Sequence, residues 1–259
     1  MGLDLSKEVV KLHRRGAREM DWRRQNLTKL PENIGILENV GRLNLSYNRI
    51  KEIPDGLGNM KNLVILNLFS NHLESLPDSF RGLVHLEELN LSHNKFSTMP
   101  RGIGNLPMLR VLDMSANTLL DISPQVGLMS NLRELYISFN VIKRIPVEMA
   151  NCPKLEKLLM SNNRVEELPT ELARLDTLET LDLSGNLIRF IPPDYGQMPK
   201  LHTFNMSQNP LHKQLHEAAR QSPKHLLQYI TTAEYDALWY EHVGKNVAED
   251  GDEDRPDEF

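Results

Sequence analysis

The sequence has very little cysteine and no long apolar run. Cys152 is the one cysteine among 259 residues, so no disulfide can form within the chain. Disulfides are typical of secreted proteins, and the opening segment MGLDLSKEVVKLHRRG lacks the apolar core of a secretory signal. The mean hydropathy is −0.42, and no apolar run is long enough to span a bilayer. These features predict a cytoplasmic protein.

The sequence also lacks the motifs of common catalytic and nucleotide-binding sites. It contains no phosphate-binding loop, no G-x-G-x-x-G and no nucleophile elbow. The net charge of −5 argues against a nucleic acid as a partner of the whole molecule. We therefore expect neither an enzyme nor a nucleic-acid-binding protein, and we expect no cofactor.

What the sequence does contain is a unit of 23 residues that recurs along most of the chain. Its pattern is L-x-x-L-x-L-x-x-N-x-L-x-x-L-P-x-x-L-x-x-L-x-x, in which the fourth position is occupied by Leu43, Leu66, Leu89, Leu112, Leu135, Leu158, Leu181 and Phe204. A fixed period of this length predicts a stack of similar coils. A single coil buries too few apolar side chains to offset the entropy of ordering it, so the coils must stack to be stable.

Within each unit the pattern changes from a strand to a turn and a return arm. Leu43 and Leu45 alternate with polar residues, which indicates a strand with one buried face. Pro54 lacks an amide hydrogen, so the arm is not expected to form a second sheet. The ninth position is an asparagine in the seven full units and in the partial one: Asn48, Asn71, Asn94, Asn117, Asn140, Asn163, Asn186 and Asn209. Because a carboxamide both donates and accepts, we expect this column to satisfy buried backbone groups at the turn.

These patterns predict an α/β solenoid with a curved parallel sheet on its concave face, irregular convex arms and helical caps. We expect a helical cap over residues 1–16, repeats over 17–211 (one degenerate, seven full and one partial), a helical cap over 212–243 and a disordered acidic tail over 244–259. In the C-terminal cap, Ser222 and Thr232 are expected to begin helices. In the fourth repeat Ser123 takes the proline position, which predicts a local change in the convex arm.

Residues that the repeat leaves free suggest a binding surface. The third, fifth and seventh positions should line the concave face, where most side chains are small and polar. Aromatic and apolar residues stand out against this background, and aromatic residues dominate protein interfaces. The candidate partner-binding residues are Tyr47, Phe69, His93, Tyr136, Phe139 and Leu159. The alternative is that they are scattered surface residues of no special role.

Three other features have an ordinary reading beside a functional one. His72 and His93 fall on neighbouring coils without a cysteine or carboxylate to complete a metal site, and His212 and His216 have the spacing of a helical metal pair or of a plain surface pair. We expect no metal. Cys152 occupies an apolar position of the repeat, so we expect a buried thiol.

The start of the chain fits a lipidation pattern. MGLDLS would make Gly2 a myristoyl acceptor, and the basic residues that follow could add a second membrane signal. The alternative is a cap helix with a solvated basic face. Any membrane association is expected only through Gly2 and this basic segment.

The unit is that of a leucine-rich repeat, and its proline-bearing form of 23 residues resembles intracellular proteins of the Ras-group type. Within that group the chain resembles the Ras suppressor family. NLVILNLFSNHLESLP and MPRGIGNLPMLRVLDMSANTL resemble repeats of that family. HLLQYITTAEYDALWYEH resembles its C-terminal cap, through His225, Tyr229, Ile230, Tyr235, Leu238 and His242, with Trp239 in place of another aromatic residue. The segment around Gly2 and the acidic tail differ from the family.

The resemblance implies a monomeric, non-catalytic adaptor in cell adhesion and Ras-linked signalling. Its implied partner is a LIM-domain adaptor of the PINCH type, in the complex with integrin-linked kinase, at cell-matrix adhesions. A second hypothesis is a scaffold that binds Ras-family GTPases or a phosphatase. A third, an enzyme with the repeats as a recognition arm, would need a catalytic domain for which the segments outside the repeats are too short.

Overall fold

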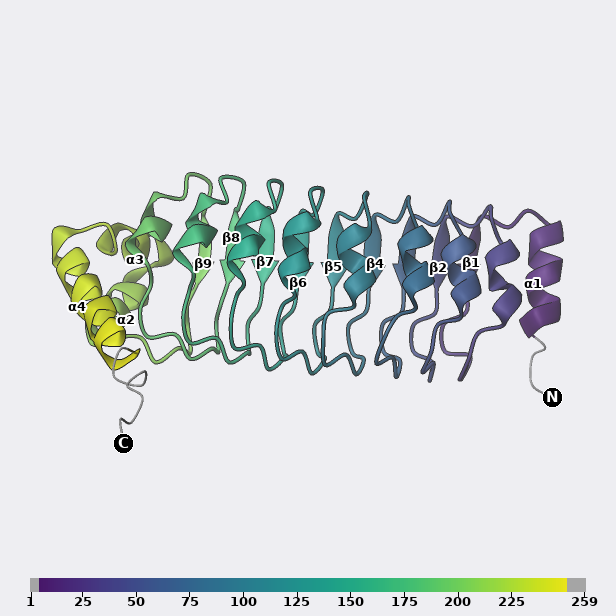
Figure 1. The fold of residues 1–259 in the computed structure, drawn as a ribbon, viewed down its shortest axis with the longest axis horizontal. Helices are drawn as coiled ribbons and strands as arrows, with labels where there is room; N and C mark the ends of the chain where they lie inside the picture. Colours follow the sequence, from purple (N-terminus) through teal and green to yellow (C-terminus); the bar gives the residue numbers. More distant parts are fainter. Residues whose placement is uncertain (1–4, 251–259) are drawn as a thin grey trace, which may run out of the picture.

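The computed structural model describes residues 5–250 as a single row of stacked coils (Figure 1). The coils run from helix α1 at one end to helices α2, α3 and α4 at the other. Gly2, the candidate lipid acceptor, lies outside the described residues.

One sheet of nine parallel strands runs the length of the row, in chain order. The strands are β1 (Glu19–Asp21), β2 (Arg42–Asn44), β3 (Ile65–Asn67), β4 (Glu88–Asn90), β5 (Val111–Asp113), β6 (Glu134–Tyr136), β7 (Lys157–Leu159), β8 (Thr180–Asp182) and β9 (Thr203–Asn205). Paired residues are one repeat apart, as in Leu43 opposite Leu66. The 23-residue period therefore sets the register of the whole sheet, and the predicted solenoid is confirmed.

Each return arm carries a short 3₁₀ helix rather than the irregular segment that the sequence predicts. These helices are η1 (Glu32–Ile36), η2 (Asp55–Asn59), η3 (Asp78–Gly82), η4 (Arg101–Asn105), η5 (Pro124–Leu128), η6 (Val147–Asn151), η7 (Thr170–Arg174) and η8 (Pro193–Gln197). A proline precedes most of them in extended conformation, as Pro54 does with φ −70° and ψ 150°. The arms pack closely, since a Cβ at Gly58 would lie 2.1 Å from the carbonyl oxygen of Ser79.

The exception in the fourth full repeat changes the arm very little. Ser123 stands where other arms have proline, and its hydroxyl accepts a hydrogen bond from the backbone N–H of Gln125 at 3.3 Å. The helix that follows, η5, has the same five-residue length as its neighbours. The local change in the convex arm is thus limited to the cap of this helix, because a serine cap and a proline one residue later serve the same turn.

The asparagine column lies just beyond the strands, buried except at Asn209, and joins neighbouring coils. In the middle of the row, Asn117 Oδ1 accepts from the backbone N–H of Phe96 at 3.0 Å. Its Nδ2 donates to the carbonyl of Leu91 at 3.1 Å and to that of Met114 at 2.9 Å. The same three bonds recur at the other members of the column: Asn48, Asn71, Asn94, Asn140, Asn163, Asn186 and Asn209. Each side chain thus satisfies backbone groups that the turn would leave unpaired.

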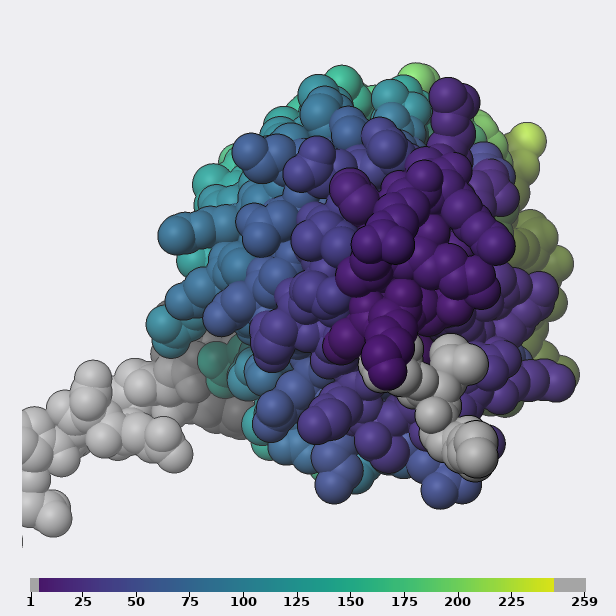
Figure 2. Space-filling model, turned by 90° about the vertical axis from the view of Figure 1, so that its right-hand side faces the viewer, coloured from purple at the N-terminus to yellow at the C-terminus, as the bar shows by residue number. Residues whose placement is uncertain are grey.

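Helix α1 (Leu5–Arg14) covers the first coil. Val9 is fully buried against the core, and Leu5 and Leu12 pack beside it. Figure 2, which looks at the molecule from its right-hand side in Figure 1, shows this helix lying across the end of the row. The apolar face of α1 shields an edge that would otherwise expose the core.

Three helices close the other end: α2 (Lys213–Gln221), α3 (Pro223–Tyr229) and α4 (Ala233–Asp250). Ser222 caps α3 by accepting from the N–H of His225 at 3.0 Å, and Thr232 Oγ1 accepts from the N–H of Tyr235 at 3.3 Å. The buried Tyr235 hydroxyl donates to the carbonyl of Ile191 at 2.7 Å and accepts from its N–H at 3.0 Å. Helix α2 lies within the helical cap expected over 212–243, although the sequence analysis names no residue that begins it. Helix α4 continues to Asp250, past the residue where the acidic tail was expected to begin.

Candidate protein-binding surface

The outward side chains of the nine strands and of the residues just after them form one continuous surface, here called the sheet face. It is the surface that the sequence predicts to be concave. The inward side chains, such as Leu43 and Leu45, are buried, so they are unavailable to a partner. Binding on this side must therefore use the positions that the repeat leaves free.

Three candidate residues near the N-terminal end form a stack of aromatic rings. The ring centres of Tyr47 and Phe69 are 4.9 Å apart, and those of Phe69 and His93 are also 4.9 Å apart. Both pairs meet edge to face, at 76° and 71°. The guanidinium of Arg24 lies over Tyr47, 4.7 Å from the ring centre. We call Arg24, Tyr47, Phe69 and His93 the aromatic ladder.

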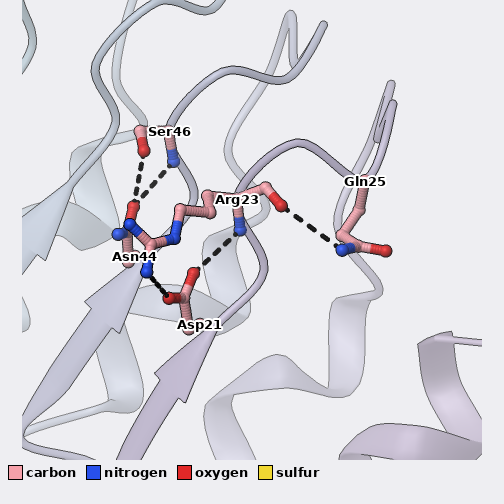
Figure 3. A network of polar contacts seen from close by, with 5 residues as sticks. All are labelled: Asp21, Arg23, Gln25, Asn44 and Ser46. Atoms are coloured by element: carbon pink, nitrogen blue, oxygen red, sulfur yellow. Dashed lines mark hydrogen bonds and ion pairs between the residues drawn. The ribbon is translucent and has the colours of Figure 1, made fainter.

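The polar residues beside the ladder hold one another in place (Figure 3). Arg23 pairs with Asp21 at 2.8 Å, and the Asp21 carboxylate also accepts from the N–H of Arg23. Asn44 accepts from both the N–H and the hydroxyl of Ser46, at 3.0 and 2.7 Å. Arg23, Asn44 and Ser46 line a hollow of about 560 Å³ together with the rings of Tyr47 and Phe69. The ladder therefore borders an open, mostly polar depression.

The eighth residue of every coil has a left-handed backbone. The φ angle is between 52° and 67° at Arg24, Tyr47, Ser70, His93, Ala116, Phe139, Asn162, Gly185 and Gln208. This conformation suits glycine and asparagine and costs a bulky residue about 1 to 2 kcal/mol. Gly185 and Asn162 fit it, whereas Tyr47 and Phe139 do not. Their side chains are 47% and 61% exposed, so burial does not compensate for the strain.

A second group lies in the middle of the sheet face and is joined by polar contacts. The Tyr136 hydroxyl donates to Glu134, whose carboxylate lies 3.4 Å from the Lys157 ammonium. Lys157 also donates to the Tyr136 hydroxyl at 3.4 Å. Burial raises the pKa of Tyr136, and the hydrogen bond to Glu134 raises it further, so the phenol keeps its proton. We call Glu134, Tyr136 and Lys157 the central cluster.

The structure does not join all the residues that the sequence groups together. Leu159 pairs directly opposite Tyr136 on the next strand. Phe139 makes no ring contact with Tyr136 within the described residues, and it projects from the left-handed row instead. The six candidates therefore form two places on the sheet face, with Phe139 beside the second.

Several binding candidates were missed by sequence reasoning. Arg24 takes the eighth position of the degenerate repeat, so counting back 23 residues from Tyr47 would have found it. Glu134 and Lys157 are exposed positions of adjacent strands, and only the structure shows that they meet at Tyr136. Exposure alone would not have found them, since Leu128 on a convex arm is 61% exposed, as much as Phe139.

The remaining candidate residues from the sequence make contacts within the fold. The Cys152 thiol is buried, donates to the carbonyl of Val126 at 3.2 Å, and has its pKa raised to about 11 by burial. His212 precedes α2 and its ring stacks on Phe190, with ring centres 5.3 Å apart. Among residues 5–250, no three His, Cys, Asp or Glu side chains are grouped as a metal site would require.

Sequence profiles of repeat families match most of the solenoid. The profile described as leucine rich repeat matches residues 74–119, 107–165 and 153–211, which together are more than half of the chain. A second profile, leucine rich repeats in two copies, matches residues 39–82. The chain belongs to the leucine-rich repeat family. Leucine-rich repeats typically serve as protein-interaction modules.

Solved leucine-rich repeat structures have the same architecture. A leucine-rich repeat protein of Leptospira interrogans is 28% identical over 79% of this chain and 58% of its own, with a TM-score of 0.65. A plant peptide hormone receptor, RGFR1 in complex with RGF2, is 33% identical over 71% of this chain and 30% of its own, with a TM-score of 0.63. This leucine-rich repeat chain thus spans less than two thirds of either. A search of curated proteins gave no significant match.

No helix within residues 5–250 of this leucine-rich repeat protein is both long and apolar enough to cross a bilayer.

Proposed function

We propose that this leucine-rich repeat protein is a non-catalytic adaptor that binds a folded protein partner on its sheet face. The observation that carries the proposal is the strained, exposed aromatic side chains of the left-handed row. Phe139 has φ 56°, is 61% exposed and makes no ring contact with another described residue, so its strain is not offset by packing within the chain. Tyr47 has the same φ and is 47% exposed. Binding of a partner accounts for aromatic residues at these strained and exposed positions, because aromatic side chains dominate binding hot spots.

The binding surface of this proposal consists of Tyr47, Phe69, His93, Tyr136, Phe139 and Leu159, to which the structure adds Arg24. The plant receptor in complex with RGF2 supports the use of this fold for protein ligands. The asparagine column has the separate role of joining the coils, and we assign it no contact with a partner.

For the partner we propose a LIM-domain adaptor of the PINCH type, in a complex with integrin-linked kinase. This rests on the resemblance of the C-terminal cap to the Ras suppressor family, through residues such as Tyr229, Tyr235 and Leu238. The protein would then be a monomeric, cytoplasmic component of cell-matrix adhesions with a role in Ras-linked signalling. A scaffold for Ras-family GTPases or a phosphatase is the alternative.

The test is calorimetry of the full chain with a recombinant LIM-domain adaptor of the PINCH type. We expect the pairs Tyr47→Ala with Phe69→Ala, and Tyr136→Ala with Phe139→Ala, each to weaken binding at least tenfold. Leu128→Ala is the matched control, since Leu128 is as exposed as Phe139 but lies on a convex arm. Unchanged affinity in both pairs would remove the sheet face from the interaction.

The same chain should be offered to a Ras-family GTPase loaded with either nucleotide, and to a phosphatase. Capture of one of these by the wild-type chain, together with no binding of the LIM-domain adaptor, would replace the proposed partner with the alternative. Lipidation of Gly2 remains a separate proposal, which mass spectrometry of the protein from its native cell would decide.

A further inference from the structure

The residues just before and just after the ninth position of each coil include no acidic side chain along the whole row. The eighth positions are Arg24, Tyr47, Ser70, His93, Ala116, Phe139, Asn162, Gly185 and Gln208. The tenth positions are Asn26, Arg49, His72, Lys95, Thr118, Val141, Arg164, Leu187 and Pro210. The chain as a whole has 35 acidic against 30 basic residues. The strip that these rows form therefore differs in charge from the rest of the molecule.

Basic side chains gather on this strip beside the aromatic ladder. Arg24, Arg49, His72 and Lys95 are all exposed and belong to the first four coils. We call these four residues the basic strip. Arg24 contacts the Tyr47 ring through its guanidinium and still presents an open side to solvent.

None of the four makes an ion pair with another described residue. Basic side chains elsewhere on the sheet face do: Arg23 pairs with Asp21 at 2.8 Å, Arg42 with Glu19 at 3.5 Å, and Lys157 with Glu134 at 3.4 Å. The basic strip thus keeps its charged groups free of carboxylates within the described residues, although His72 Nδ1 lies 2.9 Å from the Asn71 carbonyl, while neighbouring cations pair with carboxylates of the chain itself.

The spacing of the strip fits a short extended segment. Neighbouring strands of a sheet lie about 4.8 Å apart, so the four coils extend over about 14 Å, the length of four to five extended residues. Along these coils the cations and the rings alternate in sequence: Arg24, Tyr47 and Arg49, then Phe69, His72, His93 and Lys95.

We propose that the basic strip and the aromatic ladder together bind an acidic segment of a protein partner. Carboxylates of the segment pair with Arg24, Arg49 and Lys95, and an apolar or aromatic side chain of the segment packs on the exposed ring of Tyr47 and the partly buried ring of Phe69. This deepens the proposed function, because it states the chemistry of the partner's contact at one end of the sheet face.

The ring geometry disfavours a nucleic acid as the occupant of the same strip. In proteins that bind single-stranded nucleic acid, the bases stack on the open faces of aromatic side chains. Here the rings meet edge to face, at 76° and 71°, and the Arg24 guanidinium covers part of Tyr47. A segment with carboxylates needs only the ring edges and the cations.

The experiment is a selection of random twelve-residue peptides displayed on phage against the immobilised full chain. We expect the selected peptides to be enriched at least threefold in Asp and Glu over the unselected library, next to an apolar or aromatic residue. A synthetic copy of the most enriched peptide should bind at least tenfold more weakly to the double variant Arg24→Glu with Lys95→Glu. Its affinity for the wild-type chain should fall as salt rises.

The matched control is the double variant Arg81→Glu with Arg101→Glu, which makes the same charge change on the convex helices η3 and η4. We expect it to bind the peptide as the wild-type chain does. A selection without acidic enrichment, or a peptide that the strip variant binds as tightly as the wild type, overturns the proposal. So does tighter binding of a fluorescent single-stranded oligonucleotide than of the peptide, with the same loss in the strip variant.

Failure of this selection and failure of the proposed function give different results. A chain that binds the LIM-domain adaptor through the sheet face but selects no acidic peptides keeps its function and loses the acidic contact. A chain that selects acidic peptides and ignores the LIM-domain adaptor keeps the contact and loses that partner.

Discussion

The aromatic ladder and the central cluster lie on the same sheet, in coils of equal length, and satisfy their polar groups in opposite ways. In the central cluster the hydroxyl, carboxylate and ammonium of Tyr136, Glu134 and Lys157 bond to one another. In the ladder the rings meet only through their edges, and Arg24 has no carboxylate partner among the described residues.

This difference separates two kinds of aromatic surface. A partner that docks on the central cluster must either keep its internal bonds or replace them, and broken charged bonds are expensive. A partner that docks on the ladder displaces mainly water. The ladder is therefore the better place for a strong contact, and the central cluster the better place for a contact that depends on shape.

The largest predicted effect, on the free energy of unfolding, tests whether the asparagine column stabilises the coils of the ladder and those of the central cluster equally. We expect Asn71→Ala, under the ladder, and Asn140→Ala, under the central region, each to lower the free energy of unfolding by about 3 kcal/mol, because each leaves a buried backbone N–H and two carbonyls without their partner. Urea unfolding measures it. The exposed Asn62 makes one hydrogen bond to the Glu38 carbonyl, so Asn62→Ala should cost less than about 1 kcal/mol. If one of these two variants lost less than a third of the unfolding free energy that the other loses, the column would not support the two regions equally.

The second prediction separates the two places by pH. Burial raises the pKa of Cys152 from 9.0 to about 11, so the thiol contributes stability that is complete below pH 9 and is lost as the pH rises to 11. The equivalent positions in the ladder coils are Met60, Leu83 and Leu106, which do not ionise.

Over that interval we expect the wild type to lose about 2 to 3 kcal/mol more unfolding free energy than Cys152→Val does. Denaturant unfolding at pH 8, 9, 10 and 11 measures the difference between the two proteins. Parallel pH curves for both would show that the thiol does not titrate as its burial requires.

A third prediction compares one ring in each place. Position seven is serine in nearly every other coil, so Phe69→Ser restores the repeat pattern while it removes the middle ring of the ladder. Because truncation of an aromatic side chain in a binding hot spot typically costs more than about 1 kcal/mol of binding free energy, we expect binding of the LIM-domain adaptor to fall about tenfold. Tyr136→Phe keeps its ring and should change the affinity by less than threefold. Calorimetry that ranks the two variants in the reverse order would assign the stronger contact to the central cluster.

The smallest effect concerns the left-handed row. Phe139→Asn places at φ 56° a residue that tolerates this conformation, so we expect the free energy of unfolding to stay the same or to rise by up to about 1 kcal/mol. Tyr47→Asn relieves the same strain but removes the contact with Phe69, so its stability should fall below that of Phe139→Asn. Thermal unfolding of both variants makes the comparison, and a marked destabilisation by Phe139→Asn would mean that its ring supports the fold.

Much of the fold could be predicted because every coil of the repeat has to meet the same physical requirements. The strand positions, the buried asparagines and the caps at Ser222 and Thr232 all follow from local patterns. The 3₁₀ helices were not predicted, because apolar spacing in a five-residue turn does not distinguish a tight helix from an irregular arm.

The candidate surface was predicted only as a set of residues. The ladder joins position eight of one coil to position seven of the next and position eight of the third, a zigzag that no repeat position reveals. The strain at Tyr47 and Phe139 is a backbone property, and neither residue type indicates it. The pairing of Lys157 with Tyr136 depends on side-chain length and direction across two strands.

The row of left-handed residues has a consequence for how such a protein acquires new specificity. Because each of these side chains projects from a separate coil, the side chain of one coil can be changed without disturbing the next coil. The side chains of this row can therefore be exchanged while the backbone of the coils stays the same. Transplanting Tyr47, Phe69 and His93 with their flanking cations onto four consecutive coils of another stack of the same period should carry the recognition with them.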